Sequence, residues 1–447
     1  MTDTADSTGL LTDHYELTML QASLRDGTAH RRSVFELFAR RLPDGRRYGV
    51  VAGVNRLLDA LQQFRFDDEA IAFLTERGII DRATCDWLAD YRFTGDIVGY
   101  ADGEIFFPGS PVLVVESSFA EAVVLETVFL SILNHDSAVA SAASRMTWWA
   151  CGRPCIEMGS RRTHEHAAVA AALAAYIGGF ATTSNLEAAR RYGIPSAGTA
   201  AHAFTLLHDT ERDAFVSQVD ALGKGTTLLV DTYDVTEAVR TAVEITGPEL
   251  GAVRLDSGDL PSLAGQVREQ LDALGATKTR IIVTSDLDEY QIAALAPAPV
   301  DAYGVGTSLV TGSGHPTCGF VYKLVAREDA DGNLVPVAKK SKDKLSIGGR
   351  KYALRRRTAD GVAEVELIGI GEPPAGDGDD RNLLRPLVEA GKVVGRTTPD
   401  ESRAHHLEVR DELPRRASQL SHGEPVIPTE YLGDLPVRNP FPPRGRR

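Results

Sequence analysis

Cysteine is scarce in this chain, and the spacing of its cysteines argues against the common metal sites. Only four cysteines occur among 447 residues, and no two of them form a C-x-x-C pair. The segment CGRPC (151–155) has no second pair that could complete a zinc site. A large chain with so few cysteines is typical of a reducing compartment, so we expect free thiols and a cytoplasmic location.

Positive charge and long apolar runs are scarce as well. The chain has 62 acidic and 48 basic side chains and a net charge of −14, which argues against nucleic acid as its main partner. The longest apolar stretch, 167–177, makes only about three helical turns and is too short to cross a membrane. Residues 1–8 are polar and acidic, unlike a signal peptide. We expect no nucleic acid and no membrane partner.

The middle of the chain predicts an α/β fold. Between 119 and 321, helical patterns alternate with short apolar or β-branched runs. We expect helices at 121–133, 137–150, 164–177, 185–191, 210–221, 235–246, 261–274 and 288–295, with strands in CIEMG, GGFATTS, IPSAG, TTLLVDT, GAVRLDS, RIIVTSD and AYGVGT. Such alternation implies parallel strands, and seven or so units favour a closed, TIM-like α/β barrel, with an open doubly wound sheet as the alternative.

The two flanking segments mix short helices and strands. We expect helices at 10–24 and 55–63, and strands at 33–39, 97–100, 111–116, 321–325 and 335–340, the last two joined by the turn DADGN. We expect 1–118 and 322–447 to form one discontinuous α+β domain, with the barrel at 119–321. The tail 425–447 is rich in Pro and Arg, which suits either a strap over a surface or disorder.

Polar residues follow the predicted barrel strands, whose carboxyl ends meet at one edge. They are Gly159, Ser160, Arg161 and Arg162; Thr183, Ser184 and Asn185; His202; Asp231, Thr232 and Asp234; Arg254, Asp256, Ser257, Gly258 and Asp259; Ser285, Asp286 and Asp288; and Gly304, Gly306 and Thr307. Helix capping alone accounts for Asp234, Ser285 and Asp288. It does not require Arg161, Arg254 and His202, so we interpret the set as a site.

The chemistry of this set suits phosphates and a small anion. The bare backbone of 304–307 suits a phosphate monoester. Asp256, Asp259 and Asp286 can accept hydrogen bonds from ribose hydroxyls or hold water-coordinated Mg²⁺. Arg161 and Arg254 offer planar forks for a carboxylate or phosphate. A sugar bearing several phosphates and a small anionic acceptor would satisfy all three groups.

His202 lies among small residues in GTAAHAF (198–204), which we place at the exit from a short strand, 194–197. Small neighbours leave an imidazole open to a ligand, and a neutral imidazole can act as a base, a metal ligand or a phosphoryl acceptor. An isolated histidine is more often structural, so its neighbours along the strand ends decide the interpretation.

Nine motifs carry a resemblance that runs nearly end to end. They are LLTDHYELTM (10–19), FELFARRLP (35–43), EMGSRRTH (157–164), GGFATTSN (178–185), GTAAHAF, RLDSGD (254–259), TSDLDE (284–289), YGVGTSLVTG (303–312) and KKSKDKLSIGG (339–349). Together they resemble the bacterial nicotinate phosphoribosyltransferases, with one departure at His14, where family members often carry an apolar residue.

The resemblance implies an ATP-dependent enzyme of the ligase class, acting in NAD salvage. Its substrates would be nicotinate, 5-phosphoribosyl 1-diphosphate and ATP, and its products nicotinate mononucleotide, diphosphate, ADP and phosphate. It also implies a type II phosphoribosyltransferase fold, an irregular α/β barrel with a discontinuous α+β domain, in a homodimer with shared active sites. Mg²⁺ would be the cofactor.

The resemblance also implies roles for individual residues. His202 would be the phosphorylated histidine, Arg254 would meet the nicotinate carboxylate, and Asp256 the ribose hydroxyls. Further substrate contacts would come from Tyr15 of the partner subunit, Arg40 or Arg41, Arg161, Thr183, Ser184, Asn185, Ser257, Gly258, Asp286, Gly304, Gly306 and Thr307. Mg²⁺ would reach Asp256 and Asp286 through diphosphate and water.

One residue position bears on which pyridine substrate accepts the ribose group. The resembling nicotinamide enzymes carry an aspartate in the segment that matches GGFATTSN, and the matching residue here is Ser184. A hydroxyl can donate a hydrogen bond to a substrate carboxylate, whereas an aspartate would repel it, so we expect nicotinate as the substrate. A quinolinate- or nicotinamide-using enzyme and a non-catalytic nucleotide sensor stay as alternatives. A Schiff-base aldolase would need a lysine at a strand end, and none of the predicted strands ends in one.

Overall fold

The computed structural model describes residues 7–339 and 346–433. The chain divides into two compact units, one made of Met1–Ala138 with Thr317–Arg447 and the other of Val139–Pro316. Most of the motif at 339–349 and the end of the tail at 425–447 lie outside the described residues.

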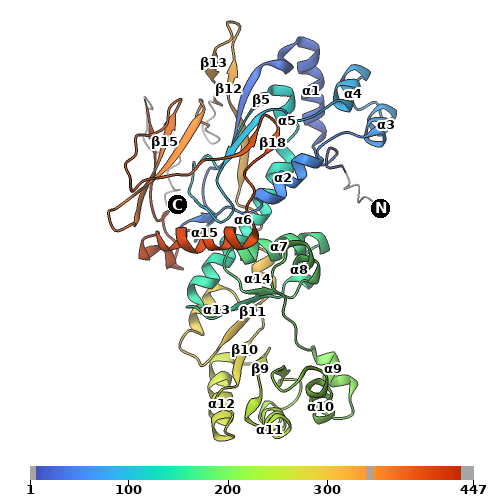
Figure 1. Ribbon diagram of the computed structural model, residues 1–447, viewed down its shortest axis with the longest axis vertical. Coiled ribbons are helices and arrows are strands. Elements are labelled where there is room, and N and C mark those ends of the chain that lie inside the picture. The colour runs from blue at the N-terminus through green and yellow to red at the C-terminus, as the bar shows by residue number, and fades with distance from the viewer. Residues whose placement is uncertain (1–6, 340–345, 434–447) are drawn as a thin grey trace. The chain divides into compact units, whose positions relative to one another are not determined.

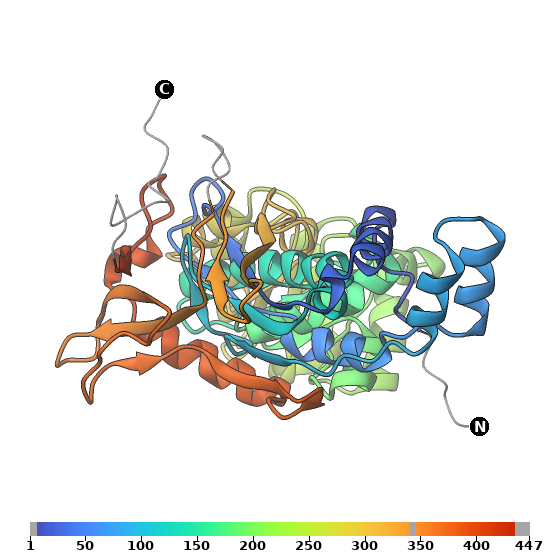
Figure 2. The same ribbon diagram turned by 90° about the horizontal axis from the view of Figure 1, so that it is seen from above.

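The first unit is built on a seven-stranded sheet whose neighbouring strands all pair antiparallel. Its order is β13 (Leu334–Pro336), β12 (Phe320–Glu328), β1 (Arg32–Ala39), β5 (Leu113–Ser118), β3 (Asp96–Gly99), β17 (Arg385–Glu389) and β18 (Lys392–Val393). The blue β1 and the orange β12 lie side by side in Figures 1 and 2, so segments from both ends of the chain share one sheet. The predicted strands of both flanks are therefore present, with bounds shifted by a few residues.

Shorter elements complete this unit. A second sheet has the order β16 (Arg381–Asn382), β14 (Lys351–Arg357), β15 (Ala363–Ile370), β19 (Thr429–Leu432), and β2 (Gly49–Val50) pairs with β4 (Ile105–Phe106). The helices are α1 (His14–Asp26), α2 (Val54–Gln63), α3 (Asp68–Glu76), α4 (Arg82–Ala89), α5 (Phe119–Val123) and α15 (Pro399–Asp411). The expected helices at 10–24 and 55–63 correspond to α1 and α2.

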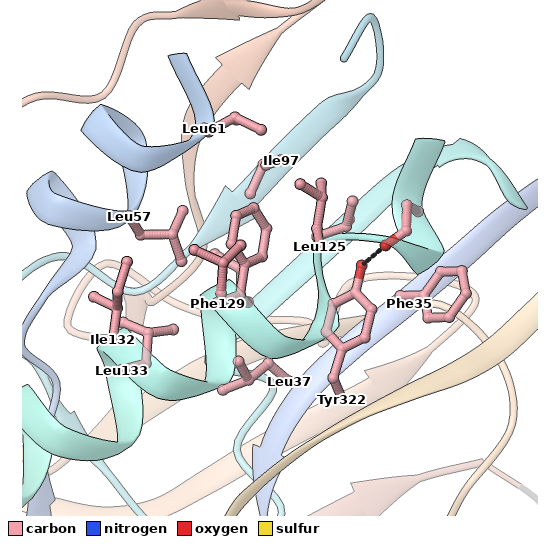
Figure 3. Packing of buried hydrophobic residues seen from close by; sticks show 14 of the residues in the cluster. Phe35, Leu37, Leu57, Leu61, Ile97, Leu125, Phe129, Ile132, Leu133 and Tyr322 are labelled. Atoms are coloured by element: carbon pink, nitrogen blue, oxygen red, sulfur yellow. Dashed lines mark hydrogen bonds between the residues drawn. The ribbon is translucent and has the colours of Figure 1, made fainter. Parts of the chain in front are cut away.

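The core of the first unit lies between this large sheet and the helices. Phe129 and Leu133, on the helix that follows α5, pack with Leu37 of β1 and Leu57 of α2 (Figure 3). All four are buried, and burying a side chain of this size contributes about 1.5–3 kcal/mol. Tyr322 anchors the C-terminal segment here, because its hydroxyl donates to the carbonyl of Ala122 at 3.0 Å.

The second unit carries a six-stranded sheet in which every neighbouring pair is parallel. Its order is β7 (Thr182–Thr183), β6 (Cys155–Glu157), β11 (Ala302–Val305), β10 (Arg280–Val283), β9 (Ala252–Leu255) and β8 (Thr227–Leu229). The predicted α/β fold with a parallel sheet is confirmed. The sheet is a half-barrel, because the run IPSAG adds only one bridge, between Thr183 and Ser196, and no ladder among the described residues joins it to β8.

The helices of this unit alternate with the strands as expected. They are α7 (Glu165–Ile177), α8 (Leu186–Tyr192), α9 (His202–Leu207), α10 (Glu211–Leu222), α11 (Val235–Thr246), α12 (Leu260–Ala273), α13 (Glu289–Ala294) and α14 (Thr307–Val310). Figure 1 shows α10, α11 and α12 beside the sheet. The prediction for His202 was wrong in one respect: this residue begins the helix α9 and does not leave a strand.

The two helices expected at 121–133 and 137–150 were also placed wrongly, because most of this region is the single helix α6 (Glu126–Trp149). Two polar residues in the middle of this helix bind other segments: Asn134 accepts from the N–H of Phe320, and Asp136 binds Arg56 at 2.7 Å. The segment Phe119–Trp149 is long and apolar enough to cross a membrane, but 67% of its most apolar window is buried inside the protein, as in a core helix.

Candidate active site

The site is built on one face of the parallel sheet in the second unit. Along β9, side chains alternate between faces, so Arg254 shares a face with Ala252, which packs with Ile282 and Ala302 of the neighbouring strands. By the same alternation Asp256, two residues after Arg254 and just past the end of β9, lies on this face as well. The hydroxyl of Thr284, after β10, donates to the Asp256 carboxylate. This face of the sheet is therefore apolar along the strands and polar at their carboxyl ends.

His202, the first residue of α9, is held at this edge by neighbours from two strand ends. Its Nδ1 lies 3.1 Å from the hydroxyl of Thr232. Its Nε2 lies 3.9 Å from Oδ1 of Asp231 and 3.9 Å from Oδ2 of Asp256. The imidazole is 41% exposed. It is therefore oriented by the protein and still open to a ligand.

Asp231 joins the ends of β8 and β9. Its Oδ2 accepts from the N–H of Asp256 and from the hydroxyl of Ser257, each at 2.8 Å. Its side chain is only 3% exposed, and its Oδ1 is buried with no hydrogen-bond partner among the described residues. One oxygen of this carboxylate is structural, and the other faces His202.

Arg254 presents a cation with an unused donor. One terminal nitrogen donates to the hydroxyl of Thr199 at 2.6 Å, and its Nε is buried without a partner among the described residues. Burial lowers the pKa of Arg254, Asp256 and Asp231 raise it, and the like charge of Arg161 lowers it. The charge of Arg161 therefore acts on Arg254.

A second group of polar contacts joins the ends of β6 and β7. Glu157 is buried, and its carboxylate accepts from the hydroxyl of Thr183 and the N–H of Gly159. Burial raises the pKa of Glu157, and these hydrogen bonds oppose the shift. Asn185 caps α8 through Oδ1 and donates to the hydroxyl of Ser160 at 3.0 Å. Thr183 and Asn185 are thus engaged within the protein.

Ser184 lies between these two residues and is exposed. Its N–H donates to the carbonyl of Glu157 at 2.8 Å, which fixes the backbone beside the end of β6. Of the three predicted substrate residues in this segment, Ser184 is the one that faces solvent.

Close packing requires glycine at two positions, one within β11 and one just after β6. A Cβ on Gly304 would lie 2.5 Å from Cγ2 of Thr284 and 2.8 Å from Sδ of Met158. A Cβ on Gly159 would lie 3.1 Å from the carbonyl oxygen of Gly306 and would clash with Val310. Gly304 is needed for close packing of strands, and the loop at Gly306 lies against the end of β6. Thr307 begins the four-residue helix α14.

Turns after β9 and β10 complete the edge. Gly258 has φ +90°, a conformation that favours glycine, and the exposed Ser285 has φ +118°, which strains a residue with a side chain. Asp286 is exposed. The capping interpretation is confirmed for two aspartates, because Asp234 caps α11 and Asp288 forms a capping box at α13.

Two predicted residues belong to the first unit. Tyr15 is 46% exposed on α1, and burial together with Glu126 raises its pKa to about 12. Arg40 follows β1 with its guanidinium 5.8 Å from the Phe38 ring centre, and burial lowers its pKa.

Comparison with known proteins assigns this arrangement to a family. Profiles of the N-terminal domain and of the main domain of nicotinate phosphoribosyltransferase match residues 10–134 and 154–359. The chain belongs to the nicotinate phosphoribosyltransferase family. It is 60% identical to nicotinate phosphoribosyltransferase pncB1 of Mycobacterium tuberculosis, over 96% of each chain. It is 38% identical to the Bacillus subtilis nicotinate phosphoribosyltransferase over 78% of this chain and 73% of that one.

The fold agrees with this membership. The crystal structure of human nicotinic acid phosphoribosyltransferase superposes with a TM-score of 0.80 at 26% identity, covering 92% of this chain and 96% of the human one. Nicotinate-nucleotide pyrophosphorylase from Pyrococcus furiosus superposes with a TM-score of 0.74 at 25% identity, covering 91% and 95%. The resemblance found in the sequence motifs is therefore confirmed at the level of the family and of its fold.

Sequence reasoning missed three residues that the geometry brings to this family site: Thr199, Glu157 and Thr284. Thr199 and Glu157 lie inside motifs that were singled out for their neighbours. Thr284 could have been found from the strand period, because it shares a face with Gly304 and Asp256.

Proposed function

We propose that this chain joins nicotinate to 5-phosphoribosyl 1-diphosphate, releasing nicotinate mononucleotide and diphosphate, and couples this step to ATP hydrolysis through phosphorylation of His202. Family membership supports the phosphoribosyl transfer and its place in NAD biosynthesis. The observation that carries the ATP coupling is the setting of His202, with Thr232 at Nδ1 and two carboxylates at 3.9 Å from Nε2.

Recognition of the acceptor falls to Arg254. Its Nε is buried and has no partner within the described part of the chain, so a carboxylate could accept a hydrogen bond from it. A guanidinium binds carboxylates in a planar fork. Exposed Ser184 offers a hydroxyl, whereas an aspartate there would repel the substrate. These two residues favour nicotinate over nicotinamide.

The transfer step needs positioning and electrostatics more than a base. The pyridine nitrogen attacks C1 of the ribose, the bond from C1 to the diphosphate oxygen breaks, and the diphosphate leaves with the electron pair. Asp256, fixed by Thr284 and by the backbone link to Asp231, would orient the ribose hydroxyls and stabilise positive charge at C1. Ser257 and Gly258 would line the same turn, and Gly306 and Thr307 would bind the 5-phosphate.

In the coupling step, His202 acts as the nucleophile. The two carboxylates near Nε2 favour a proton on that nitrogen, which leaves the lone pair on Nδ1. Nδ1 attacks the γ-phosphorus of ATP, the N–P bond forms, and the bond to the β,γ-bridging oxygen breaks as ADP leaves. Water later attacks phosphorus, which releases phosphate and restores the imidazole. The phosphorylated and unphosphorylated enzymes would bind the substrates with different affinities, and this difference would couple ATP hydrolysis to the transfer step.

Mg²⁺ is the cofactor that this chemistry requires, and the available ligands suit an ion that is bound together with the substrate. Among the described residues, no group of three or more His, Cys, Asp or Glu side chains could hold a metal ion by itself. Asp256 and Asp286 would supply one or two carboxylates, as in sites where Mg²⁺ keeps several waters and binds substrate phosphates. When bound, the ion would neutralise charge on the leaving diphosphate.

Further expectations concern the assembly and its surroundings. The proposal includes a homodimer in which Tyr15 and the arginine Arg40 serve the site, and a cytoplasmic location. Four free thiols, three of them buried, agree with a reducing compartment.

One experiment tests the proposal. The protein is incubated with phosphoribosyl diphosphate, Mg²⁺ and γ-labelled ATP, together with nicotinate, nicotinamide or quinolinate. Of the three pyridines, we expect only nicotinate to react, and its product to be nicotinate mononucleotide. We also expect His202 to become labelled. The His202→Ala variant should lose both the label and the ATP coupling. His208→Ala is the matched control, since His208 directly follows α9 and its Nδ1 lies 2.8 Å from the Phe204 carbonyl oxygen. Failure to form nicotinate mononucleotide, or full ATP coupling in His202→Ala, contradicts the proposal.

A further inference from the structure

Glu289 is a buried carboxylate that neither the transfer step nor the coupling step uses. It is the first residue of α13, and its side chain is only 3% exposed. Its Oε1 accepts from Nε of Arg145, on α6, at 3.0 Å. Its Oε2 accepts from the hydroxyl of Ser313 at 2.7 Å. One carboxylate therefore joins α13 to α6 and to the loop that follows α14.

The position of this carboxylate is fixed by two sets of contacts. Arg145 and Glu289 form an ion pair in which both side chains are buried, and breaking such a pair leaves a buried charge without its partner. The start of α13 is fixed separately, because the Asp288 side chain accepts from two backbone N–H groups in a capping box. Oε2 of Glu289 is therefore a fixed acceptor for Ser313.

The loop that follows α14 contains three consecutive left-handed residues. Ser313 has φ +52°, between Gly312 at +62° and Gly314 at +81°. Glycine adopts this region without a steric cost, whereas a side chain makes it unfavourable. The hydroxyl of Ser313 makes a contact with Glu289 that glycine would lack. The N–H of Ser313 donates to the carbonyl of Ser308 at 2.6 Å, which ties the loop to α14.

We propose that Glu289 is a positioning residue for phosphoribosyl diphosphate, because through Ser313 it fixes the place of α14. The backbone of Gly306 and Thr307, where α14 begins, then stays in the position in which it binds the 5-phosphate. This inference rests on the proposed role of these two residues. Helix α14 has only four residues, and a helix this short depends on tertiary contacts. Release of the loop at Ser313 would therefore shift the phosphate-binding backbone.

The expected signature is weaker binding at one end of the substrate. Gly306 and Thr307 would hold the 5-phosphate in the ground state and in the transition state alike. Their displacement should therefore raise KM for phosphoribosyl diphosphate and leave kcat nearly unchanged. The diphosphate end, expected at Asp256 and Asp286, should be affected much less. A merely structural role of Glu289 would reduce the amount of folded enzyme without separating the two ends.

The test compares Glu289→Gln with the wild type in steady-state turnover and in competition with two partial ligands, ribose 5-phosphate and inorganic diphosphate. We expect KM for phosphoribosyl diphosphate and the inhibition constant of ribose 5-phosphate to rise about tenfold. The kcat and the inhibition constant of diphosphate should stay within about twofold. Glu412→Gln is the matched control and should change none of these values. It alters a carboxylate of the first unit that likewise bridges two partners, Arg357 and Arg381.

A second variant, Ser313→Gly, tests the same link if Glu289→Gln does not fold. It keeps the buried ion pair, suits the left-handed backbone and removes only the hydroxyl. It should raise the same two constants by about threefold, the size expected for one hydrogen bond. Unchanged constants in Ser313→Gly or in folded Glu289→Gln, or an equal rise for both partial ligands, overturn this inference and leave the proposed function intact. A wild type that forms no nicotinate mononucleotide overturns the proposed function, and this inference with it.

Discussion

The N–H of Asp256 donates to Oδ2 of Asp231 at 2.8 Å, so the ends of β8 and β9 are fastened together beside His202. This hydrogen bond holds the Asp231 carboxylate in place, and its other oxygen, Oδ1, lies 3.9 Å from Nε2 of His202. The consequence is that Asp231 should matter to catalysis through geometry as well as through charge.

Asp231→Ala removes the acceptor for Asp256 and Ser257. We expect kcat/KM for phosphoribosyl diphosphate to fall by about 10- to 100-fold, because small displacements of positioned groups are costly. Steady-state kinetics measure the effect. Asp220→Ala, an exposed residue on α10, is the control and should behave like the wild type. Equal kinetics for both variants would show that the link is dispensable.

Arg254→Lys keeps the charge and loses the planar fork. We expect KM for nicotinate to rise by about tenfold or more, since one buried donor and the contact with Thr199 are lost. The KM for phosphoribosyl diphosphate should change much less. Arg240→Lys, on the exposed face of α11, controls for the substitution itself. An unchanged KM for nicotinate contradicts the assigned role.

Ser184→Asp places a negative charge where the substrate carboxylate is expected. Turnover of nicotinate should fall sharply, by about 100-fold, because like charges meet in a partly desolvated site. Ser184→Ala, which removes only the hydroxyl, should lose far less. Competition assays with nicotinamide show whether the preference has shifted. Kinetics like those of the wild type in Ser184→Asp would defeat the choice of nicotinate.

Gly304→Ala forces a Cβ to within 2.5 Å of Thr284 and 2.8 Å of Met158. We expect unfolding free energy to fall by about 1–3 kcal/mol, together with lower activity. Gly265→Ala offers a matched comparison, because a Cβ in the middle of α12 meets nothing within 4 Å. That variant should gain about 0.5–1 kcal/mol from helix propensity. Denaturant unfolding of both variants decides the matter.

His406 should make the protein sensitive to acid. It is buried on α15, its Nδ1 lies 3.0 Å from the Gly103 carbonyl, and burial, helped by Arg410 and His405, lowers its pKa to about 3. The unfolded chain binds this proton more readily than the folded one. The free energy of unfolding is therefore not reduced by His406 above about pH 6.5. It decreases as the pH falls from there toward 3, by up to about 1.4 kcal/mol per pH unit.

Urea unfolding between pH 7 and 5 measures that slope. His406→Gln should flatten it by about one proton. His422→Gln, at an exposed histidine, should leave the slope unchanged. The same slope in all three proteins would mean that other groups cause the acid sensitivity.

Sequence patterns predicted the parallel strands and the polar residues at their ends, because strand period and helix caps are local properties. Arg254 and Asp256 were placed together on this basis. The helix at His202 was missed because a segment of six residues is too short to show a helical period and depends on tertiary contacts to become helical.

The supporting contacts were beyond local reasoning. Thr183 donates to Glu157 across 26 residues of sequence, and Thr284 donates to Asp256 across 28. Only the order of strands in the sheet brings such pairs together, and no single segment encodes that order.

The pairing of Ala39 with Phe320 has a consequence for biosynthesis. Strand β1 must wait for 281 further residues before its second neighbour exists, which at 5–20 residues per second takes about 14–56 s on the ribosome. Until then its edge toward β12 has no strand to pair with, while its other edge already has β5. The nascent chain therefore carries an incomplete sheet, with one strand edge unpaired, throughout synthesis of the half-barrel.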